Sequence, residues 1–397
     1  MQWTKSLPAA FCAMAFSLLL VGCGERANKA VDDGKTIKLM FIGQITDTAN
    51  ATPVPESLAG VEAAVKRINA DGGINGRVIT LITCDDKADA NEAAKCARQA
   101  VRENVSATIG NNSNFGEAIL SVLERGGVAS IGQLPITQQD FSSPVAFPLQ
   151  AGSAGMIAGA AKLLSSQGAT AIALAAVDSP AGALNEQFAN AGLAGTSAKV
   201  LGLTLVPIEA PDYASYAASV TRESDGVLIG MNSDQAGRFV QSLKQAGASQ
   251  RVALTVGAVP PSMVSRLGAA AEGLFVTSPF RPIEAGGESN AQYLADMKAY
   301  APGARKNVFS QGGWLAVETF AKVMRVRQIN DFSPANVLDV MGSLEDFDAG
   351  DMIPRLTTNT TLPAPYNRLF VNKVMFARIQ DGQLALIDEE WHGGLIQ

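Results

Sequence analysis

Two cysteines, Cys84 and Cys96, are the residues whose type and spacing most directly suggest chemistry in this chain. They stand twelve positions apart in the stretch CDDKADANEAAKC, and the 397-residue chain has four cysteines in all. Such a pair can form a disulfide, act as a redox couple, supply half of a metal site or remain as two buried thiols. Spacing alone does not separate these possibilities, because the outcome depends on the compartment in which the protein folds.

Metal binding and catalysis find little support elsewhere in the sequence. The chain has one histidine, His392, and two cysteines with one distant histidine do not complete a four-ligand zinc site. The stretch GNNSNFG lacks the spacing of a nucleophile elbow, and the glycines of GGINGR close a helix, whereas those of a dinucleotide fingerprint open one. The stretch DDKADANEAAK lacks the glycine and the alternating ligands of an EF-hand loop. We therefore expect no enzyme activity, no metal and no cofactor.

The N-terminus predicts export. An apolar run from Leu7 to Val21 is too short for a comfortable membrane span and fits the core of a signal peptide. It ends in the letters LVGC, which resemble the lipobox of bacterial lipoproteins, where the cysteine receives the lipid. We expect residues 1–22 to be a signal peptide, Cys23 to be lipidated, and residues 23–35 to be a flexible tether. An ordinary secretion signal or a short N-terminal anchor is the alternative.

Export changes the interpretation of the cysteines. Signal cleavage would remove Cys12 and lipid would occupy Cys23, which leaves Cys84 and Cys96 together in an oxidising compartment. We therefore favour a disulfide between them, with two separate buried thiols as the alternative. The net charge of −6 argues against nucleic-acid binding, which needs clustered Lys and Arg. No apolar run after residue 23 is long enough to span a membrane, so the lipid is the expected membrane contact.

Strand and helix patterns alternate along the mature chain of about 375 residues. A continuous apolar run such as IKLMFIG at 37–43 is typical of a strand buried on both faces, and an apolar stripe predicts an amphipathic helix at 58–70. Asp89 and Glu92 are spaced as an N-cap and its capping-box partner, at the start of a helix that carries Cys96. Two successive series of such units predict an α/β fold with two doubly wound parallel-sheet lobes.

The segment GVEAAVKRINADGGINGRVITLITCDD, at 60–86, resembles the type I periplasmic-binding-protein superfamily, and within it the branched-chain amino acid type of ABC transporter substrate-binding protein. ADANEAAKCARQAV, DSPAG and GWLAVETF resemble further segments of that family, so the resemblance covers about residues 36–390. It implies two Rossmann-like lobes joined by a three-strand hinge that closes on a ligand. The expected N-terminal lobe comprises 36–148 and about 280–328, and the C-terminal lobe comprises 149–279 and about 329–397. The hinge crossings are expected near Phe147–Gln150, near Ser278–Arg281 and around residues 325–335.

The resemblance also implies a ligand at the carboxyl ends of the strands, where loops of both lobes meet. In the family, two loops of the first lobe receive a ligand carboxylate through backbone N–H and hydroxyl groups, and a helix N-terminus follows one of them. The ligand-binding residues expected in the N-terminal lobe are Thr46, Glu56, Asn112, Ser113, Asn114, Gln133, Leu134 and Thr137. Those expected in the C-terminal lobe are Ser179, Ala181, Asn232, Asp234 and Ala258. Turn chemistry alone is the alternative for the polar loop residues.

Two positions depart from the family pattern. Ala181 stands where the family has a ligand-contacting Tyr, and the loop GAVPP lacks the acid that pairs with an amino-acid ammonium group. Because an unpaired buried charge is costly, Asp234 or Glu56 would have to substitute for that acid in an amino-acid binder. The sequence leaves the ligand open among amino acids, apolar or aromatic carboxylates, amides and other organic solutes.

The function implied by the resemblance is that of an extracytoplasmic, membrane-anchored lipoprotein. It would capture a small organic ligand, an amino acid or a related carboxylate or amide, between its lobes and deliver it to the permease subunits of an ABC transporter. We expect a monomer whose membrane contact is the lipid on Cys23. A lipid-tethered ligand sensor of the same fold, read by a signalling partner, is the alternative, and neighbouring genes for permeases and ATPases would favour transport.

Overall fold

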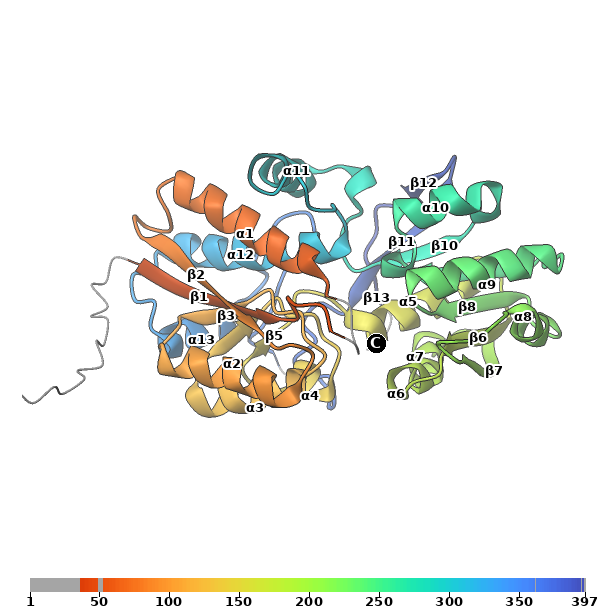
Figure 1. The fold of residues 1–397 in the computed structure, drawn as a ribbon, viewed down its shortest axis with the longest axis horizontal. Coiled ribbons are helices and arrows are strands. Elements are labelled where there is room, and N and C mark those ends of the chain that lie inside the picture. Colours follow the sequence, from red (N-terminus) through yellow and green to blue (C-terminus); the bar gives the residue numbers. More distant parts are fainter. Residues whose placement is uncertain (1–35, 49–52, 361, 394, 396–397) are drawn as a thin grey trace, which may run out of the picture. The chain divides into compact units, whose positions relative to one another are not determined.

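The first sheet is parallel and has five strands in the order β2-β1-β3-β4-β5 (Figure 1). The computed structural model describes residues 36–48, 53–360, 362–393 and 395. The strands are β1 (Thr36–Gly43), β2 (Val78–Asp85), β3 (Ala107–Ile109), β4 (Ala129–Ile131) and β5 (Ala146–Phe147). The helices that accompany them are α1 (Pro55–Ala70), α2 (Ala90–Arg102), α3 (Gly116–Gly126), α4 (Gln138–Ser142), α11 (Glu288–Tyr300), α12 (Val308–Val326) and α13 (Pro334–Gly342). The predicted signal peptide, the tether and Cys23 lie outside the described residues.

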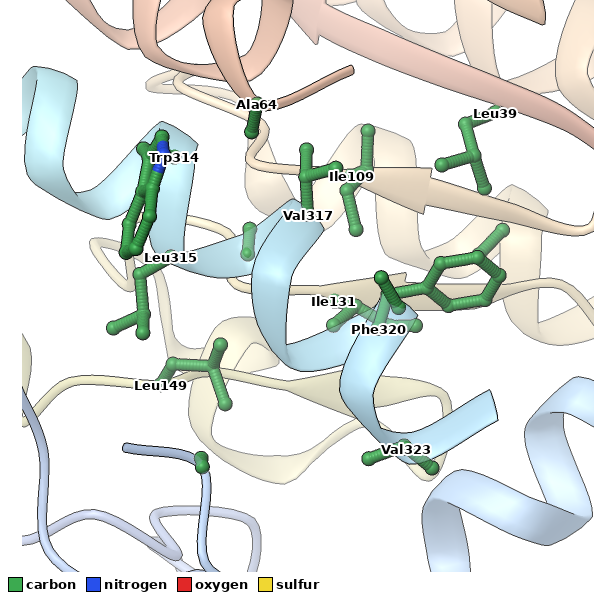
Figure 2. Packing of buried hydrophobic residues seen from close by; sticks show 14 of the residues in the cluster. Leu39, Ala64, Ile109, Ile131, Leu149, Trp314, Leu315, Val317, Phe320 and Val323 are labelled. Atoms are coloured by element: carbon green, nitrogen blue, oxygen red, sulfur yellow. The ribbon is translucent and has the colours of Figure 1, made fainter. Parts of the chain in front are cut away.

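Both faces of this sheet are buried under helices. Alternate residues of β1 point to opposite faces, so the two sets of side chains enter different cores. Ile37, Leu39 and Phe41 belong to a hydrophobic core that α1 and α12 cover, which we call the α1/α12 core. Met40 and Ile42 pack against α2 and α3 on the other side. Figure 2 shows part of the α1/α12 core, in which side chains of α12 lie against those of β1, β3 and β4.

The second sheet in the described part of the chain has eight strands, in the order β12-β11-β10-β9-β8-β6-β7, with β13 paired to β11. The strands are β6 (Ala171–Val177), β7 (Lys199–Val206), β8 (Gly226–Gly230), β9 (Arg251–Thr255), β10 (Phe275–Ser278), β11 (Lys373–Gln380), β12 (Gln383–Leu386) and β13 (His392–Gly393). The helices that accompany them are α5 (Gly152–Ser166), α6 (Pro180–Ala183), α7 (Asn185–Gly192), α8 (Ala214–Thr221), α9 (Ser233–Gln245) and α10 (Pro261–Leu267). Short 3-10 turns are η1 (Val256–Ala258), η2 (Gly268–Ala271) and η3 (Ile283–Ala285).

The two sheets share one topology. Strands β6 to β10 are parallel and follow the same spatial order as β1 to β5, and the antiparallel strands β11 and β12 extend the edge beyond β10. Each order reverses direction once, between β1 and β3 and between β6 and β8. Doubly wound sheets bind ligands at the carboxyl ends of the strands beside such a switch point.

The predicted α/β fold with two parallel-sheet lobes is confirmed. The run at 37–43 forms β1, and the apolar stripe of the predicted helix at 58–70 is buried on α1. The sequence patterns did not identify the antiparallel strands β11, β12 and β13 or the short helices α4, α6, α10 and α13. Among the described residues, no helix is both long and apolar enough to cross a membrane.

The segment after residue 329 was expected to belong to the C-terminal lobe, but it packs on the first sheet. Phe332, Val337, Met341, Met352 and Leu356 belong to the α1/α12 core of the first sheet. The chain enters the second sheet only with β11, which begins at Lys373. Apolar side chains of α13 and of the segment that follows it are buried by the first sheet and its helices, so the chain has not yet left that lobe at residue 335. We therefore propose that the third crossing lies near residues 371–373.

Of the two contacts predicted at the start of α2, the N-cap at Asp89 is formed and the capping-box contact of Glu92 is not. The Asp89 side chain accepts hydrogen bonds from the N–H groups of Asn91 and Glu92, at 2.8 and 3.0 Å, which confirms it as the N-cap. The reciprocal bond of a capping box is not formed, because the Asp89 N–H already donates to the Asp86 carbonyl and the Glu92 carboxylate pairs with Lys95 at 3.0 Å.

Two glycines allow α1 and α12 to lie in close contact. A Cβ atom added to Gly60 would overlap the carbonyl oxygen of Ser310, and one added to Gly313 would overlap the carbonyl oxygen of Ser57. The helices therefore meet backbone to backbone at this crossing, which leaves no space for even a methyl group. This close packing positions the first turn of α12, which contributes to the site described below.

Replacing Gly313 by Ala should destabilise the protein by about 1–3 kcal/mol, because the added methyl group forces the two helices apart. Urea unfolding would measure the loss. Gly342→Ala is the matched control, since a Cβ at Gly342, the last residue of α13, meets no atom within 4 Å. The control should keep or slightly raise stability, because alanine favours a helix over glycine. Equal unfolding midpoints for G313A and the unmodified chain would contradict the close-packing account.

Candidate functional site

A buried asparagine joins the carboxyl ends of three strands in the first sheet. Asn111 Oδ1 accepts the Ile42 N–H at 2.9 Å, and Asn111 Nδ2 donates to Thr108 Oγ1 at 2.9 Å and to Ser130 Oγ at 3.2 Å. These partners belong to β1, β3 and β4. The loop at residues 112–114 is thereby fixed beside the switch point between β1 and β3.

The strand ends and their loops surround a hollow of about 170 Å³, which we call the edge hollow. It is lined by Gln44, Val54, Asp86, Ala88, Asn112, Ser113, Asn114, Phe115, Leu134, Ile136 and Phe309. Four residues that the sequence singled out therefore lie together: Asn112, Ser113, Asn114 and Leu134. The Asn112 side chain donates to Ser57 Oγ at 2.8 Å, and Ser113 Oγ accepts the Phe115 N–H at 3.2 Å.

Asp85, the last residue of β2, holds the loop that follows β1. Its carboxylate accepts the N–H groups of Ile45 and Lys87, at 3.0 and 2.9 Å, and both the N–H and the hydroxyl of Thr46. Burial opposes ionisation, but these hydrogen bonds outweigh it and lower the pKa of the Asp85 carboxyl. Thr46 is exposed and bound to Asp85, and it does not line the edge hollow.

Asp86 has a different environment from its neighbour. It is 1% exposed and lines the edge hollow. Its Oδ1 accepts the Ala88 N–H at 2.9 Å, whereas its Oδ2 has no hydrogen-bond partner among the described residues. Burial raises the pKa of the Asp86 carboxyl, although the nearby Ser113 hydroxyl and the Ala88 N–H oppose the shift. The hollow thus contains a buried acid with one unpartnered oxygen.

Cys84 and Cys96 form a disulfide, with their Cα atoms 5.7 Å apart, which confirms the favoured interpretation of the pair. The bond joins the end of β2 to the second turn of α2. Neither cysteine lines the edge hollow, but Asp86 and Ala88, which follow Cys84 closely, do. The disulfide therefore braces the segment that forms one wall of the hollow. No group of three or more His, Cys, Asp or Glu side chains placed to hold a metal occurs in the described part of the chain.

A second hollow of about 410 Å³, which we call the wide hollow, shares Phe309 with the edge hollow. It is lined by Val256, Gly257, Val259, Pro260, Pro261, Val264, Ser278, Pro282, Ile283, Glu284, Lys306, Asn307, Val308, Phe309, Gln311, Ile379, Gly382, Gln383 and Leu384. These residues come from the segment after β9, from the segment after β10, from the β11–β12 hairpin and from the start of α12. Most of the lining is apolar, and its charged side chains are Glu284 and Lys306.

Phe309 is the residue that connects the two hollows, and sequence reasoning missed it. It stands in the first turn of α12, where Asn307 Oδ1 accepts the N–H groups of Phe309 and Ser310 at 3.1 Å each. The pattern N-x-x-S at the start of this helix was a readable N-cap signal. What the pattern could not reveal is that this helix end meets both the strand-end loops of the first sheet and the segment after β9.

Three further first-lobe candidates lie outside both hollows. Glu56 is buried and forms an ion pair with Arg305, so its carboxylate is already engaged. The Thr137 N–H and hydroxyl each lie 2.8 Å from the carboxylate of Asp140, and this pair caps α4. Gln133 is 3% exposed, and neither polar atom of its side-chain amide has a hydrogen-bond partner among the described residues.

Two of the second-lobe candidates serve as helix caps. Ser179 Oγ accepts the Gly182 N–H at 3.0 Å at the start of α6, and Asn232 Oδ1 accepts the Gln235 N–H at 3.0 Å at the start of α9. These contacts match the alternative of turn chemistry, and neither residue lines a hollow that shares Phe309. Ala181 is exposed on α6.

Asp234 and Ala258 also differ in their surroundings. Asp234 is exposed and pairs with Arg238 at 3.0 Å and Arg266 at 3.8 Å, so it is engaged like Glu56. Ala258 is 3% exposed, and its neighbours on both sides line the wide hollow. Of the second-lobe loops chosen from the sequence, the one at 257–260 thus supplies walls of the site.

Comparison with known proteins identifies related chains. The model of a family described as periplasmic binding protein matches residues 36–383. A Leu/Ile/Val-binding protein of Escherichia coli strain K12 is 26% identical over 275 residues, which cover 66% of this chain and 72% of that protein.

Solved structures of similar fold cover most of the chain. The branched-chain amino acid transporter substrate-binding protein of Streptococcus pneumoniae, in complex with isoleucine, superposes with a TM-score of 0.67 at 18% identity over 88% of this chain and 98% of that one. A fatty acid ABC transporter substrate-binding protein of Thermomonospora curvata gives 0.74 at 15% identity over 90% of this chain and 92% of that one. At these identities the likeness concerns the fold.

Reducing the Cys84–Cys96 disulfide should lower the free energy of unfolding by about 3 kcal/mol, the value expected when a loop of this size is opened. Urea unfolding with and without a reductant would measure it. The double variant Cys84→Ala/Cys96→Ala should lose a similar amount and should no longer respond to the reductant. Equal unfolding midpoints for the reduced and oxidised chain would exclude a stabilising role.

Proposed function

The chain belongs to the periplasmic binding protein family, and from this premise we propose that it captures a small organic solute and delivers it to the permease of an ABC transporter. Membership gives a solute-binding role and an extracytoplasmic location. The finer proposal is that the solute lies where the two hollows meet at Phe309, that the lobes close over it, and that the protein acts as a lipid-anchored monomer.

The observation that carries this proposal is the composition of the wide hollow. Its walls combine the segment after β9 of the second sheet with the first turn of α12, a helix of the α1/α12 core. A solute bound there would contact both lobes at once and would favour their closed arrangement. Its volume of about 410 Å³ falls within the range of small-molecule sites.

The lining supports a solute with an apolar body. Val256, Val259, Val264, Ile283 and Phe309 are among the apolar side chains of the wide hollow. The names of two similar proteins agree with this, since one is a Leu/Ile/Val-binding protein and the other is a fatty acid ABC transporter substrate-binding protein. We propose that the solute is an amino acid with an apolar side chain or a related carboxylate or amide. Glu56 and Asp234, the two acids that the sequence offered as ammonium partners, both have basic partners.

Anchoring is part of the same proposal. The letters LVGC at the end of the N-terminal apolar run support lipidation of Cys23. Two or more acyl chains on one cysteine give stable membrane attachment, whereas one chain gives marginal binding. A tethered protein would keep the captured solute close to the permease.

A solute screen tests capture and closure together. We expect at least one solute among the branched-chain and aromatic amino acids and the carboxylates and amides with the same side chains to raise the melting temperature. Small-angle scattering should then show a smaller radius of gyration with that solute. Phe309→Ala should weaken its binding about tenfold or more, because it removes an aromatic contact from both hollows, whereas Phe309→Leu should weaken it less. A solute that binds tightly without any compaction would contradict closure.

Cys23→Ser should release the protein from the membrane fraction of bacteria that produce the full chain and should abolish incorporation of labelled palmitate. Cys12→Ser is the matched control, because Cys12 lies within the predicted signal peptide and is removed with it. The control should remain in the membrane fraction and retain the label. A C23S protein that still sediments with membranes would exclude the lipid anchor.

A further inference from the structure

We propose that the edge hollow receives a hydrogen-bond donor of the solute, an ammonium or an amide N–H, and that Asp86 accepts it. This inference rests on the proposed function and reverses the polarity that the sequence implied for these loops. The resemblance implied a ligand carboxylate at two first-lobe loops, through Asn112, Ser113, Gln133 and Thr137, whereas the contacts in the structure favour a group of opposite character beside Asn112 and Ser113.

The first observation is the unpartnered oxygen of Asp86. The residue is 1% exposed, it lines the edge hollow, and its Oδ2 has no hydrogen-bond partner among the described residues. A buried polar atom without a partner costs free energy, and a carboxylate oxygen costs more than a neutral one. The adjacent Asp85 differs, because four hydrogen bonds from the protein occupy its carboxylate. Within the described part of the chain, the Asp86 carboxylate thus meets the Ala88 N–H and the nearby Ser113 hydroxyl, which leaves acceptor capacity at the wall of the edge hollow.

The second observation is that the Asn112 side-chain amide, one of the donors expected to hold a carboxylate, is already engaged. Asn112 Nδ2 donates to Ser57 Oγ at 2.8 Å. Ser113 Oγ accepts the Phe115 N–H at 3.2 Å, and its hydroxyl lies near the Asp86 carboxylate. Among the residues that line the edge hollow, Asp86 is the one charged side chain, and there is no Lys or Arg to neutralise a second anion.

The N-terminus of α3 does not change this balance. A helix N-terminus favours an anion, and α3 begins at Gly116, next to Phe115 of the edge hollow. The carboxylate of Asp140 already lies against Gly116 at this helix end, where it accepts the N–H groups of Ile136 and Thr137. A solute carboxylate in the edge hollow would thus meet the buried acid Asp86 and no cation, while an ammonium group would meet the Asp86 oxygen that has no hydrogen-bond partner among the described residues.

The charged side chains of the wide hollow are compatible with a solute whose donor group lies at Asp86. Its lining has two charged side chains, the acid Glu284 and the base Lys306. A zwitterionic solute could place its ammonium group at Asp86, its apolar body against Phe309 and its carboxylate toward Lys306. A solute whose sole polar group is a carboxylate would leave Asp86 unpaired. The predicted class is therefore amines, amides and amino acids with an apolar body, and simple carboxylic acids are disfavoured.

Matched solutes test this assignment on the full chain. The probes are the amine, the primary amide and the carboxylic acid that carry the same isobutyl, benzyl or n-hexyl body, together with L-leucine, L-isoleucine and L-phenylalanine. Titration calorimetry would give each dissociation constant. We expect the amine, amide or amino acid to bind at least about tenfold more tightly than the acid with the same body, which corresponds to about 1.4 kcal/mol. An acid that binds as tightly as its amine and amide counterparts overturns the inference.

A pair of variants isolates the residue. Asp86→Asn should weaken binding of the best ammonium-bearing probe at least about tenfold, because the negative charge is lost. Asp89→Asn removes the same charge three residues away, outside both hollows, and asparagine caps a helix as well as aspartate does. The control should bind within twofold of the unmodified chain. Unchanged binding by D86N overturns the inference.

The outcomes separate this inference from the function on which it rests. If a carboxylic acid proves to be the preferred solute and the lobes close on it, the proposed function is supported and the proposed role of Asp86 is wrong. If no probe of any class binds, the proposed function and the proposed role of Asp86 are both contradicted. If D86N does not fold, the comparison of matched solutes on the unmodified chain still decides the polarity of the edge hollow.

Discussion

The buried amide of Asn111 is the interaction on which the geometry of the site depends. It donates to Thr108 and Ser130 and accepts from the backbone of Ile42, so one side chain joins three neighbouring strands where each of them ends. Parallel strands do not determine by themselves where their loops will lie. Because Asn111 is inside the sheet edge and both polar atoms of its amide are bonded, the loop that follows starts from a fixed point and gives the edge hollow a defined shape.

Three acids near this edge have three different roles, and their partners determine which. Asp85 is bonded by backbone and hydroxyl donors and holds a loop, and Glu56 is paired with Arg305. Asp86 retains one oxygen that no donor in the described part of the chain reaches. From residue type alone, these three acids would be considered equivalent. Their surroundings make one a structural element, one half of an ion pair and one the residue with unused binding capacity.

Strands with continuous apolar runs, such as β1, were predictable from the sequence because burial on both faces leaves a strong signal. The first-sheet loop at 112–114 was also predictable, since the carboxyl ends of parallel strands meet at one edge. The segment from Phe332 to Leu356 was not, because its short apolar groups do not reveal which sheet will bury them. Phe309 was missed for the same reason: its role depends on which helix end meets which loop.

The crossing of α1 and α12 also constrains the order in which the molecule can fold. Arg67 of α1 bonds to Glu318 of α12, 251 positions later in the chain. The α1/α12 core cannot close until most of the chain has left the ribosome or the export channel, whereas β6 to β10 and their helices form one continuous stretch. Contacts between such distant segments are slow to form, because a long loop must close first. The parallel strands of the second sheet should therefore fold first. The first lobe should complete its core later, when α12 packs against α1.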